Sequence, residues 1–309
     1  MDEIVSRLVV QEMREEDVDQ AVNLFRAHDL PELKHGLRTY RRLEPEGCFV
    51  AIDPVSDEVI SSIMVSTRFD PRTAYIGFYA TKPGFQGKGI GIRCWEKMLH
   101  YLGPDRNVGL CSSPSQVSTY RDKSGFKVQD VNSMVLHESS GGINFDALVQ
   151  NVQNVQNVQN VTVRQLERKD LPSVIAYDEA IVGLDRSKLL EPGLFEPEST
   201  SMVAMIGSNV VGYGAIKPTN FDKPMIAPLY ADSPDIASCL LYHLLNSQRD
   251  FVSHGLVMFI LNTNQSAMHL ASSIGLKGGY FCPRLWTKSP ITADVSRIYG
   301  LYSPDFHPF

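Results

Sequence analysis

The stretch Gln86-Gly87-Lys88-Gly89-Ile90-Gly91 has the residue types of a phosphate-binding turn. It follows a strand-like run, Tyr75 to Thr81, and precedes a helix-like run, Ile92 to Leu102. Glycines let a backbone approach a ligand closely, and the first turn of a helix presents unpaired N–H groups and a positive dipole end to an anion. The stretch therefore predicts a site for a phosphate or pyrophosphate group.

Spacing excludes two common phosphate loops. A P-loop needs Ser or Thr after its Gly-Lys pair, but Gly89 follows Lys88. The dinucleotide fingerprint needs a third glycine where Ile92 stands. Taken alone, the stretch could also be an ordinary glycine-rich helix entry that binds nothing.

Three segments together are more specific than the loop. Gln86, Gly89 and Gly91 resemble the Gln/Arg-x-x-Gly-x-Gly/Ala signature of the GNAT superfamily of N-acetyltransferases. Thr81-Lys82-Pro83-Gly84-Phe85-Gln86 resembles the lead-in to that signature. Tyr120-Arg121-Asp122-Lys123-Ser124-Gly125-Phe126 resembles the second signature of the family, a helix that ends in Tyr-x-x-x-Gly-Phe. The chain is thus similar to this superfamily in three linked places.

The resemblance implies acetyl-coenzyme A (acetyl-CoA) as the cofactor, with the loop amides around its pyrophosphate. It also implies a splayed strand whose backbone groups bind the pantetheine arm and polarise the acetyl carbonyl, as an oxyanion hole does. Lys88 is either a charge for the phosphates or an exposed loop lysine. The residues expected to bind the cofactor are Phe78, Tyr79, Ala80, Thr81, Gln86, Gly87, Lys88, Gly89, Ile90, Gly91 and Tyr120.

The implied reaction is direct attack of an amine on the thioester, which needs a base for the ammonium and an acid for the leaving thiolate. The family's usual acid is a Tyr four residues before the Gly of Gly-Phe, but Arg121 stands there and Tyr120 precedes it by one residue. One residue turns a helical side chain by about 100°, so Tyr120 reaches the thiol only if the helix ends irregularly. Tyr120 is either the acid or an aromatic anchor of the helix.

The strand from Tyr75 to Thr81 carries no carboxylate that could act as the base. A water path to Tyr75 or Tyr79, or a carboxylate from the second half of the chain, would have to serve. Glu96 fits a solvated helix face better than a base. Cys111 has no placed His partner and is more typical of a core residue than of a nucleophile.

The predicted elements of the first half form a mixed sheet with an antiparallel meander and a crossover helix, which matches the GNAT fold. The predicted strands are 7–13, 48–53, 59–68, 75–81, 108–112 and 126–137, and the predicted helices are 16–27, 31–43, 89–102 and 115–123.

The second half repeats the first. Val9 to Val18 aligns with Thr162 to Leu171, and each reads as a strand, a polar turn with an Asp N-cap and an amphipathic helix. The second half has no glycine loop, because Ser233-Pro234-Asp235 stands in its place. The fold class is therefore α/β, with two GNAT-like domains in tandem, each a mixed sheet flanked by helices.

Between the halves lies a low-complexity segment, four copies of Val-Gln-Asn from Val149 to Asn160. The predicted domains are 1–140, which binds acetyl-CoA, a linker over 141–160, and 161–309, a degenerate domain that shapes the substrate pocket. The substrate contacts expected from loops and strand ends are Tyr75, Asp185, Arg186, Tyr230 and Asp232. Asp185 and Arg186 could instead form surface ion pairs.

Composition fits two domains of ordinary globular character, since the 309 residues are 43% hydrophobic and 21% charged. A net charge of −6 argues against nucleic acid as a partner. The five cysteines form no CxxC pair and the histidines show no ligand spacing, so we expect no metal and a reducing compartment. An acidic N-terminus and the lack of a long apolar run predict a cytoplasmic protein without a membrane anchor.

The sequence thus favours an acetyl-CoA-dependent N-acetyltransferase that acts on a small-molecule amine, either a metabolite or an amino-acid-like acceptor. The alternative is a non-catalytic coenzyme A-binding sensor or pseudoenzyme, which would bind acetyl-CoA without transferring its acetyl group. A plain interaction protein would bind no coenzyme A. The acceptor, the acyl-chain length and the oligomeric state are left open.

Overall fold

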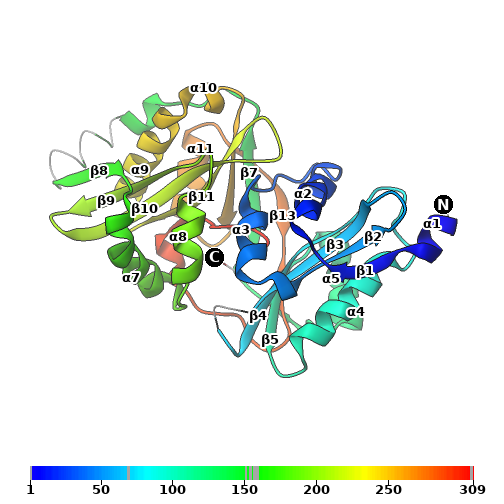
Figure 1. Ribbon diagram of the computed structural model, residues 1–309. Coiled ribbons are helices and arrows are strands. Elements are labelled where there is room, and N and C mark those ends of the chain that lie inside the picture. The colour runs from blue at the N-terminus through cyan, green and yellow to red at the C-terminus, as the bar shows by residue number, and fades with distance from the viewer. Residues whose placement is uncertain (1, 68–69, 150–151, 153–154, 156–159, 307–308) are drawn as a thin grey trace.

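Two lobes, each built on one β-sheet, lie side by side in the molecule (Figure 1). The structure is a computed structural model that describes residues 2–67, 70–149, 152, 155, 160–306 and 309. The red C-terminal segment lies where the two lobes meet, beside helices α3 and α8 (Figure 1).

The first sheet has seven strands in the order β1-β2-β3-β4-β5-β14-β6. Their bounds are β1 Val9–Glu12, β2 Cys48–Asp53, β3 Glu58–Ser66, β4 Thr73–Thr81, β5 Asn107–Cys111, β14 Arg284–Trp286 and β6 Val128–Gln129. The helices of this half are α1 Asp2–Arg7, α2 Val18–Arg26, α3 Gly36–Leu43, α4 Ile90–Leu102 and α5 Val117–Lys123. The predicted meander and crossover helix are confirmed, whereas α1 was not predicted and the helix expected over 31–43 begins only at Gly36.

The second sheet is separate from the first and has the strand order β13-β7-β12-β11-β10-β9-β8, with β15 paired to β11. Its strands are β13 Lys277–Cys282, β7 Met134–Ser139, β12 Leu256–Leu261, β11 Pro224–Ala231, β10 Asn209–Pro218, β9 Thr200–Ile206, β8 Val161–Gln165 and β15 Ile298–Gly300. The helices of this half are α7 Leu171–Val182, α8 Ser187–Leu194, α9 Pro234–Ser247, α10 Arg249–Val252 and α11 Gln265–Ser273.

The two halves exchange strands. The strand expected over 126–137 is in fact two: β6 stays in the first sheet and β7 crosses to the second, between β13 and β12. In return, β14 of the second half enters the first sheet between β5 and β6. The buried carboxylate of Asp130 marks the crossing, where it forms an ion pair with Arg284 of β14 at 3.1 Å. Each sheet therefore needs a strand from the other half of the chain.

Alternation along the strands of the first sheet builds one core on each face. Within β2, Cys48, Val50 and Ile52 join the cluster that contains α2 and α3, while Phe49 and Ala51 join the cluster under α4. This period of two is expected for a strand buried on both faces. The cluster that contains α2 and α3 also includes residues of α7, α8 and the C-terminal segment, so it joins the two lobes.

The internal repeat is visible at the start of α2 in the first half and of α7 in the second. Asp17 and Asp170 stand at the N-cap positions of α2 and α7, as predicted, but neither side chain caps its helix. Each carboxylate instead accepts a hydrogen bond from the backbone three residues earlier, at 2.7 and 2.9 Å. Arg14 and Arg164 form ion pairs with these carboxylates, both at 2.6 Å. The two halves therefore use the same device to turn from strand to helix.

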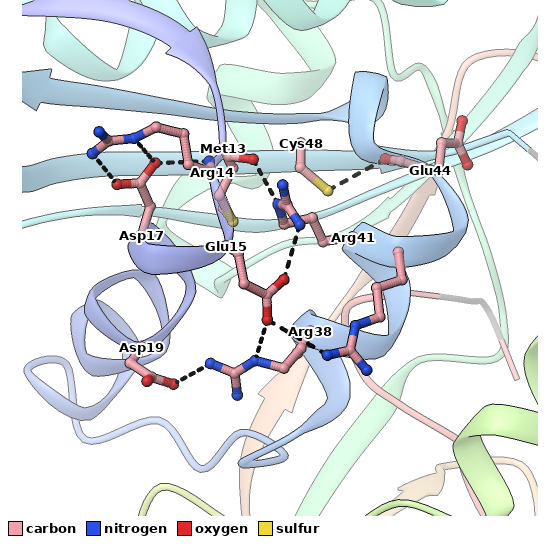
Figure 2. Close-up of polar contacts among 10 residues, drawn as sticks. Met13, Arg14, Glu15, Asp17, Asp19, Arg38, Arg41, Glu44 and Cys48 are labelled. Atoms are coloured by element: carbon pink, nitrogen blue, oxygen red, sulfur yellow. Dashed lines mark hydrogen bonds and ion pairs between the residues drawn. The ribbon is translucent and has the colours of Figure 1, made fainter.

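A cluster of charges fixes the start of α2 against α3 (Figure 2). Glu15 accepts hydrogen bonds from Arg38 at 2.7 Å and from Arg41 at 2.9 Å. Arg41 also donates from Nε to the carbonyl oxygen of Met13, at 2.6 Å. These contacts hold together both ends of the α2–α3 segment, whose connecting loop passes the cleft described below.

Most of the Val-Gln-Asn segment lies outside the described residues. Two of its valines, Val152 and Val155, are described and are buried in the core of the second lobe together with Leu148. The segment thus contributes apolar contacts as well as connecting the halves.

Candidate functional site

A cavity of about 970 Å³ opens where β4 and β5 part. These strands pair in parallel only from Thr73 with Asn107 to Ile76 with Leu110, and β4 then continues to Thr81 paired with β3 but no longer with β5. The residues of the predicted site that line the cavity are Tyr79, Ala80, Thr81, Gln86, Gly87, Gly89, Ile90, Gly91 and Tyr120. The structure therefore brings most of the expected cofactor contacts to one cleft.

The glycine loop meets the cavity with an open helix end. Gly89 is the N-cap of α4 and no side chain caps this helix. Gly87 and Gly89 have φ of 73° and 76°, a left-handed conformation that favours glycine. A Cβ on Gly91 would lie 2.7 Å from the Tyr79 hydroxyl, so this glycine allows the ring to lie against the first turn. This geometry suits an anion at the start of α4.

Lys88 and Phe78 do not line the cavity. Lys88 is half-buried beside it. The Phe78 side chain is fully buried against Phe25 and Phe306, with ring centroids at 4.4 and 5.4 Å. Its backbone N–H donates to Oδ1 of Asp305 at 3.0 Å, so this N–H is already used within the protein. The expectation that Phe78 contacts the cofactor therefore does not fit this arrangement.

Tyr120, and not Arg121, faces the cavity. Arg121 is exposed and pairs with Asp122 at 2.8 Å, whereas the Tyr120 ring packs against Trp95 and Phe126. The end of α5 is irregular as required, because Ser124 and Phe126 both donate to the Tyr120 carbonyl and Gly125 has φ of 82°. Burial raises the pKa of the Tyr120 hydroxyl above its ordinary value, with smaller contributions from Tyr79 and Asp305. The hydroxyl therefore stays protonated and can donate.

Tyr79 also lines the cavity as a neutral phenol. Its ring packs against Trp95 at 5.6 Å between centroids. Burial raises the pKa of Tyr79 to about 12. At neutral pH the hydroxyl therefore keeps its proton and donates hydrogen bonds. The phenolate, which is the form that could accept a proton as the base, is not present.

Tyr75 lies behind the cavity wall. Its side chain is buried, and its hydroxyl is 2.9 Å from Sγ of Cys111, which does line the cavity. Burial raises the pKa of the Cys111 thiol to about 12. A thiol that stays protonated is a poor nucleophile, so Cys111 serves as a wall residue here.

The four substrate residues expected from the second half are not in the cleft. Arg186 is buried in an ion pair with Asp178, with Nε to Oδ2 at 3.0 Å, and Nη2 donates to the Tyr230 hydroxyl at 3.1 Å. Asp185 is exposed and accepts a hydrogen bond from the backbone N–H of Ser187.

Asp232 accepts a hydrogen bond from Tyr177 at 2.8 Å on the surface of the second lobe. These four residues were expected in the cleft because they fall in loops or strand ends that the repeat places toward it, but they lie at the corresponding gap of the second lobe. There β15 pairs with β11 through Tyr230 and Ile298, and Leu301 donates to the carbonyl of Phe259 in β12. The chain itself thus fills the gap between β11 and β12.

Several cavity residues were not expected from the sequence because they come from distant segments. The α2–α3 connection supplies His28, whose Nε2 is 2.8 Å from the Thr81 carbonyl oxygen, and Asp29. The strand β7 supplies Glu138, and the C-terminal segment supplies Asp305. No short motif marks any of them.

The charges that line the cavity are all acidic. Among the described residues, the lining includes the carboxylates of Asp29, Glu138 and Asp305 but no Lys or Arg. The described part of the chain also holds no cluster of three or more His, Cys, Asp or Glu side chains suited to a metal ion. None of the described helices is long and apolar enough to cross a membrane.

Comparisons with known proteins agree with this geometry. Residues 10–119 match the Acetyltransferase (GNAT) family, and residues 174–300 match an Acetyltransferase (GNAT) domain. Holothin acyltransferase from Pseudoalteromonas sp. (strain SANK 73390) is 29% identical over 198 residues, which cover 64% of this chain and 60% of that protein. An uncharacterised protein of Caenorhabditis elegans is 24% identical over 55% of this chain and 54% of its own length. The chain therefore matches little more than half the length of these relatives.

Solved structures share the whole fold at low sequence identity. A provisionally described acetyltransferase from Pyrococcus horikoshii has a TM-score of 0.72 at 20% identity, covering 97% of this chain and 96% of that one. A tandem GNAT protein from the clavulanic acid biosynthesis pathway has a TM-score of 0.61 at 14% identity, covering 90% and 97%. N-myristoyltransferase of Saccharomyces cerevisiae with bound myristoyl-CoA has a TM-score of 0.64 at 8% identity, covering 96% and 86%. The chain belongs to the GNAT superfamily of acyltransferases and carries two of its domains in tandem.

Proposed function

We propose that this protein transfers the acetyl group of acetyl-CoA directly to the amine of a small metabolite or amino-acid-like acceptor. One observation carries the proposal: the uncapped, glycine-rich start of α4 opens onto the cavity formed where β4 and β5 part. A helix end of this kind binds phosphate groups, and the gap between the strands continues from it. The name of one relative, holothin acyltransferase, supports acyl transfer.

The residues around the loop fit coenzyme A. The backbone N–H groups of residues 87–91 would bind the pyrophosphate, because the positive φ of Gly87 and Gly89 exposes this part of the backbone. Tyr79 and Ala80 would contact the pantetheine arm along the part of β4 that is no longer paired with β5. The lack of a Lys or Arg among the described lining residues leaves the helix end as the main source of positive potential.

The charge of the cavity favours a cationic acceptor. Asp29 and Asp305 attract an ammonium group, and Glu138 adds less because Lys223 pairs with it. No described lining residue is a Lys or Arg that could pair with a carboxylate, so a simple amine fits this cavity better than an amino-acid-like acceptor. An alkylamine is almost entirely protonated at neutral pH, with a pKa of about 10.4. The acceptor must therefore lose a proton in the cleft before its nitrogen can attack.

Tyr120 is suited to protonate the leaving thiolate. It lines the cavity, its raised pKa keeps it in the donor form, and the thiol it would generate has an ordinary pKa of about 8.5. No covalent enzyme intermediate is needed, which agrees with the protonated state of Cys111.

A thiol-release assay tests the proposal. Purified protein is mixed with acetyl-CoA and, in parallel, with primary amines and the carboxylic acids of matched carbon skeleton. We expect free coenzyme A and acetylated product with amines only. Binding of acetyl-CoA without turnover on any amine would instead support the sensor, and release with the acids would contradict a cationic acceptor.

A further inference from the structure

The structure assigns the proton-accepting group for the acceptor amine to Asp305, held in place by Glu32. This inference rests on the proposed function and identifies a carboxylate, which the cleft strand β4 lacks. Asp305 reaches the cleft from the C-terminal segment, 227 residues away from its hydrogen-bond partner Phe78. It is partly exposed and lines the cavity.

Contacts with the backbone of β4 fix the position of Asp305. Its Oδ1 accepts the backbone N–H of Phe78, two residues past the last pair that joins β4 to β5 at Ile76. A Cβ on Gly77 would lie 1.7 Å from the carbonyl oxygen of Asp305, so the two backbones are in direct contact. Phe306 stacks on Tyr40 of α3, with ring centroids 3.7 Å apart. The carboxyl group is thus positioned rigidly at the point where the cavity begins.

The carboxyl group of Glu32 is the neighbour of Asp305. Glu32 is fully buried, and its Oε1 accepts the backbone N–H of Leu33 at 2.9 Å. Among the described residues, no N–H or hydroxyl donates to its Oε2. Asp305 lies close enough to Glu32 for its charge to raise the pKa of Glu32, and two neighbouring buried carboxyl groups do not both ionise, so the pair holds a proton.

Burial decides which carboxyl holds that proton. It raises the pKa of Glu32 well above its ordinary value, and the charge of Asp305 adds to this. Burial also raises the pKa of Asp305, whereas the hydrogen bonds from Glu32 and Phe78 oppose that change. Glu32 is therefore the protonated donor, and Asp305 is a carboxylate of increased basicity that faces the cavity.

Other titratable side chains also surround Asp305. Tyr120 and Tyr75 lie close enough to Asp305 for its charge to raise the pKa of each, and Cys111 and Cys282 are affected in the same direction. Base and acid therefore lie in the same part of the cleft. Burial is the largest cause of the raised pKa at each of these neighbours, so they remain protonated and do not compete for the proton.

The chemistry balances with these two groups. One proton passes from the ammonium nitrogen to the Asp305 carboxylate, and the free electron pair forms the C–N bond with the thioester carbon. The C–S bond breaks, and the thiolate takes the proton of the Tyr120 hydroxyl. The second nitrogen proton restores Tyr120, and Asp305 releases its proton to solvent. The products are the acetylated amine, coenzyme A and one proton.

Two nucleophiles separate this role from a structural one. n-Propylamine is protonated at neutral pH and needs a base, whereas hydroxylamine is largely neutral there and does not. In Asp305→Asn the amide oxygen still accepts the Phe78 N–H and the amide group still pairs with Glu32, so the segment stays in place. We expect kcat/KM for propylamine to fall about 100-fold at pH 7.5, while that for hydroxylamine changes little.

The pH profile gives a second readout. The residual activity of Asp305→Asn on propylamine should rise about tenfold per pH unit as free amine forms, whereas the wild type stays level over the same range. Asp185→Asn, an exposed carboxylate outside the cleft, is the matched control and should match the wild type on both nucleophiles. Calorimetry should give the same acetyl-CoA affinity for all three proteins.

Several results would overturn the assignment. An equal fall on both nucleophiles would mean that Asp305 only maintains the structure, and no fall on propylamine would remove it from the reaction. A wild type that acetylates hydroxylamine but not propylamine would show that the cleft has no such base. A wild type that acetylates neither, although hydroxylamine needs no base, would refute the proposed acyl transfer itself, and the inference with it.

Discussion

The gap between β4 and β5 and the gap between β11 and β12 are equivalent places in the two lobes, but only the first is open. In the first lobe the strands part after Ile76 and leave the cavity. In the second they part after Ile226, and the chain's own β15 occupies the space. The same fold therefore leaves a cavity in one lobe and a packed core in the other, depending on what lies between two parallel strands.

The helix that follows each gap differs in the same way. Gly89 starts α4 without a side-chain cap, whereas Ser233 starts α9 and its hydroxyl accepts the N–H of Ile236 at 3.3 Å. Pro234 at the first position of α9 has no N–H to offer. An anion at α9 would have to compete with the protein's own cap, so the comparison explains why one lobe is suited to coenzyme A and the other is not.

The largest loss of stability should come from a change in the second lobe, where β15 fills the gap between β11 and β12. Arg186→Met leaves Asp178 as an unpaired charge in the core, where both side chains are fully buried. We expect a loss of about 3–5 kcal/mol in the free energy of unfolding, with an unchanged acetyl-CoA affinity for the protein that remains folded. Urea unfolding and calorimetry measure the two quantities. A lost affinity at full stability would place Arg186 in the cofactor site.

A change at the open gap of the first lobe should instead weaken acetyl-CoA binding. Gly89→Glu puts a side chain at φ of 76° and a negative charge at the start of α4. We expect the acetyl-CoA dissociation constant to rise at least about 100-fold, or about 2.7 kcal/mol.

Ser233→Ala is the matched change in the second lobe. It should cost about 1 kcal/mol of stability and leave acetyl-CoA binding as it is. If Ser233→Ala weakened binding as much as Gly89→Glu, the distinction between the two helix ends would be wrong.

Tyr120→Phe removes the proposed donor from the open gap. The hydroxyl should matter for turnover and not for binding, so we expect kcat to fall about 10- to 100-fold at an unchanged acetyl-CoA affinity. Arg121→Ala, the neighbour that lies outside the cavity, should behave as the wild type in the same steady-state assay. The reverse order of effects would restore the assignment that strict motif spacing favours.

A small, pH-dependent effect should come from a device that the two halves share. The hydrogen bonds and charge of Arg164 lower the pKa of Asp170 to about 2, compared with about 3.9 in an unfolded chain. This stabilisation is present above pH 4 and is lost as the pH falls towards 2.

Asp170→Asn should therefore cost about 1–2 kcal/mol at pH 7 and progressively less below pH 4. Unfolding curves at several pH values test this. A difference between variant and wild type that grew on acidification would have the wrong sign.

Local signals in the sequence were enough for the open gap. The glycine loop, the strand before it and the helix after it lie within residues 75–102, and their backbone roles follow from residue type at short spacing. The order of elements in the first half is local in the same sense. The residue pattern, together with the resemblance to the GNAT superfamily, therefore predicted the fold class and the glycine-rich turn at the start of α4.

The filled gap and the proposed base depend on contacts between distant segments. Arg186 and Tyr230 were placed in the cleft because the repeat aligns them there, but the pairing of β15 with β11 could not be read from either segment alone. Asp305 comes from the opposite end of the chain, and the exchange of β7 for β14 likewise joins segments far apart. No periodicity or short motif marks such pairings.

The most direct test of the central claim is the stoichiometry of binding, measured by calorimetric titration of the full chain with acetyl-CoA. We expect one site per chain, and we expect Gly89→Glu to remove that site. Two sites per chain, or one site that remains intact in Gly89→Glu, would contradict it, because either result would place coenzyme A somewhere other than the open gap of the first lobe alone.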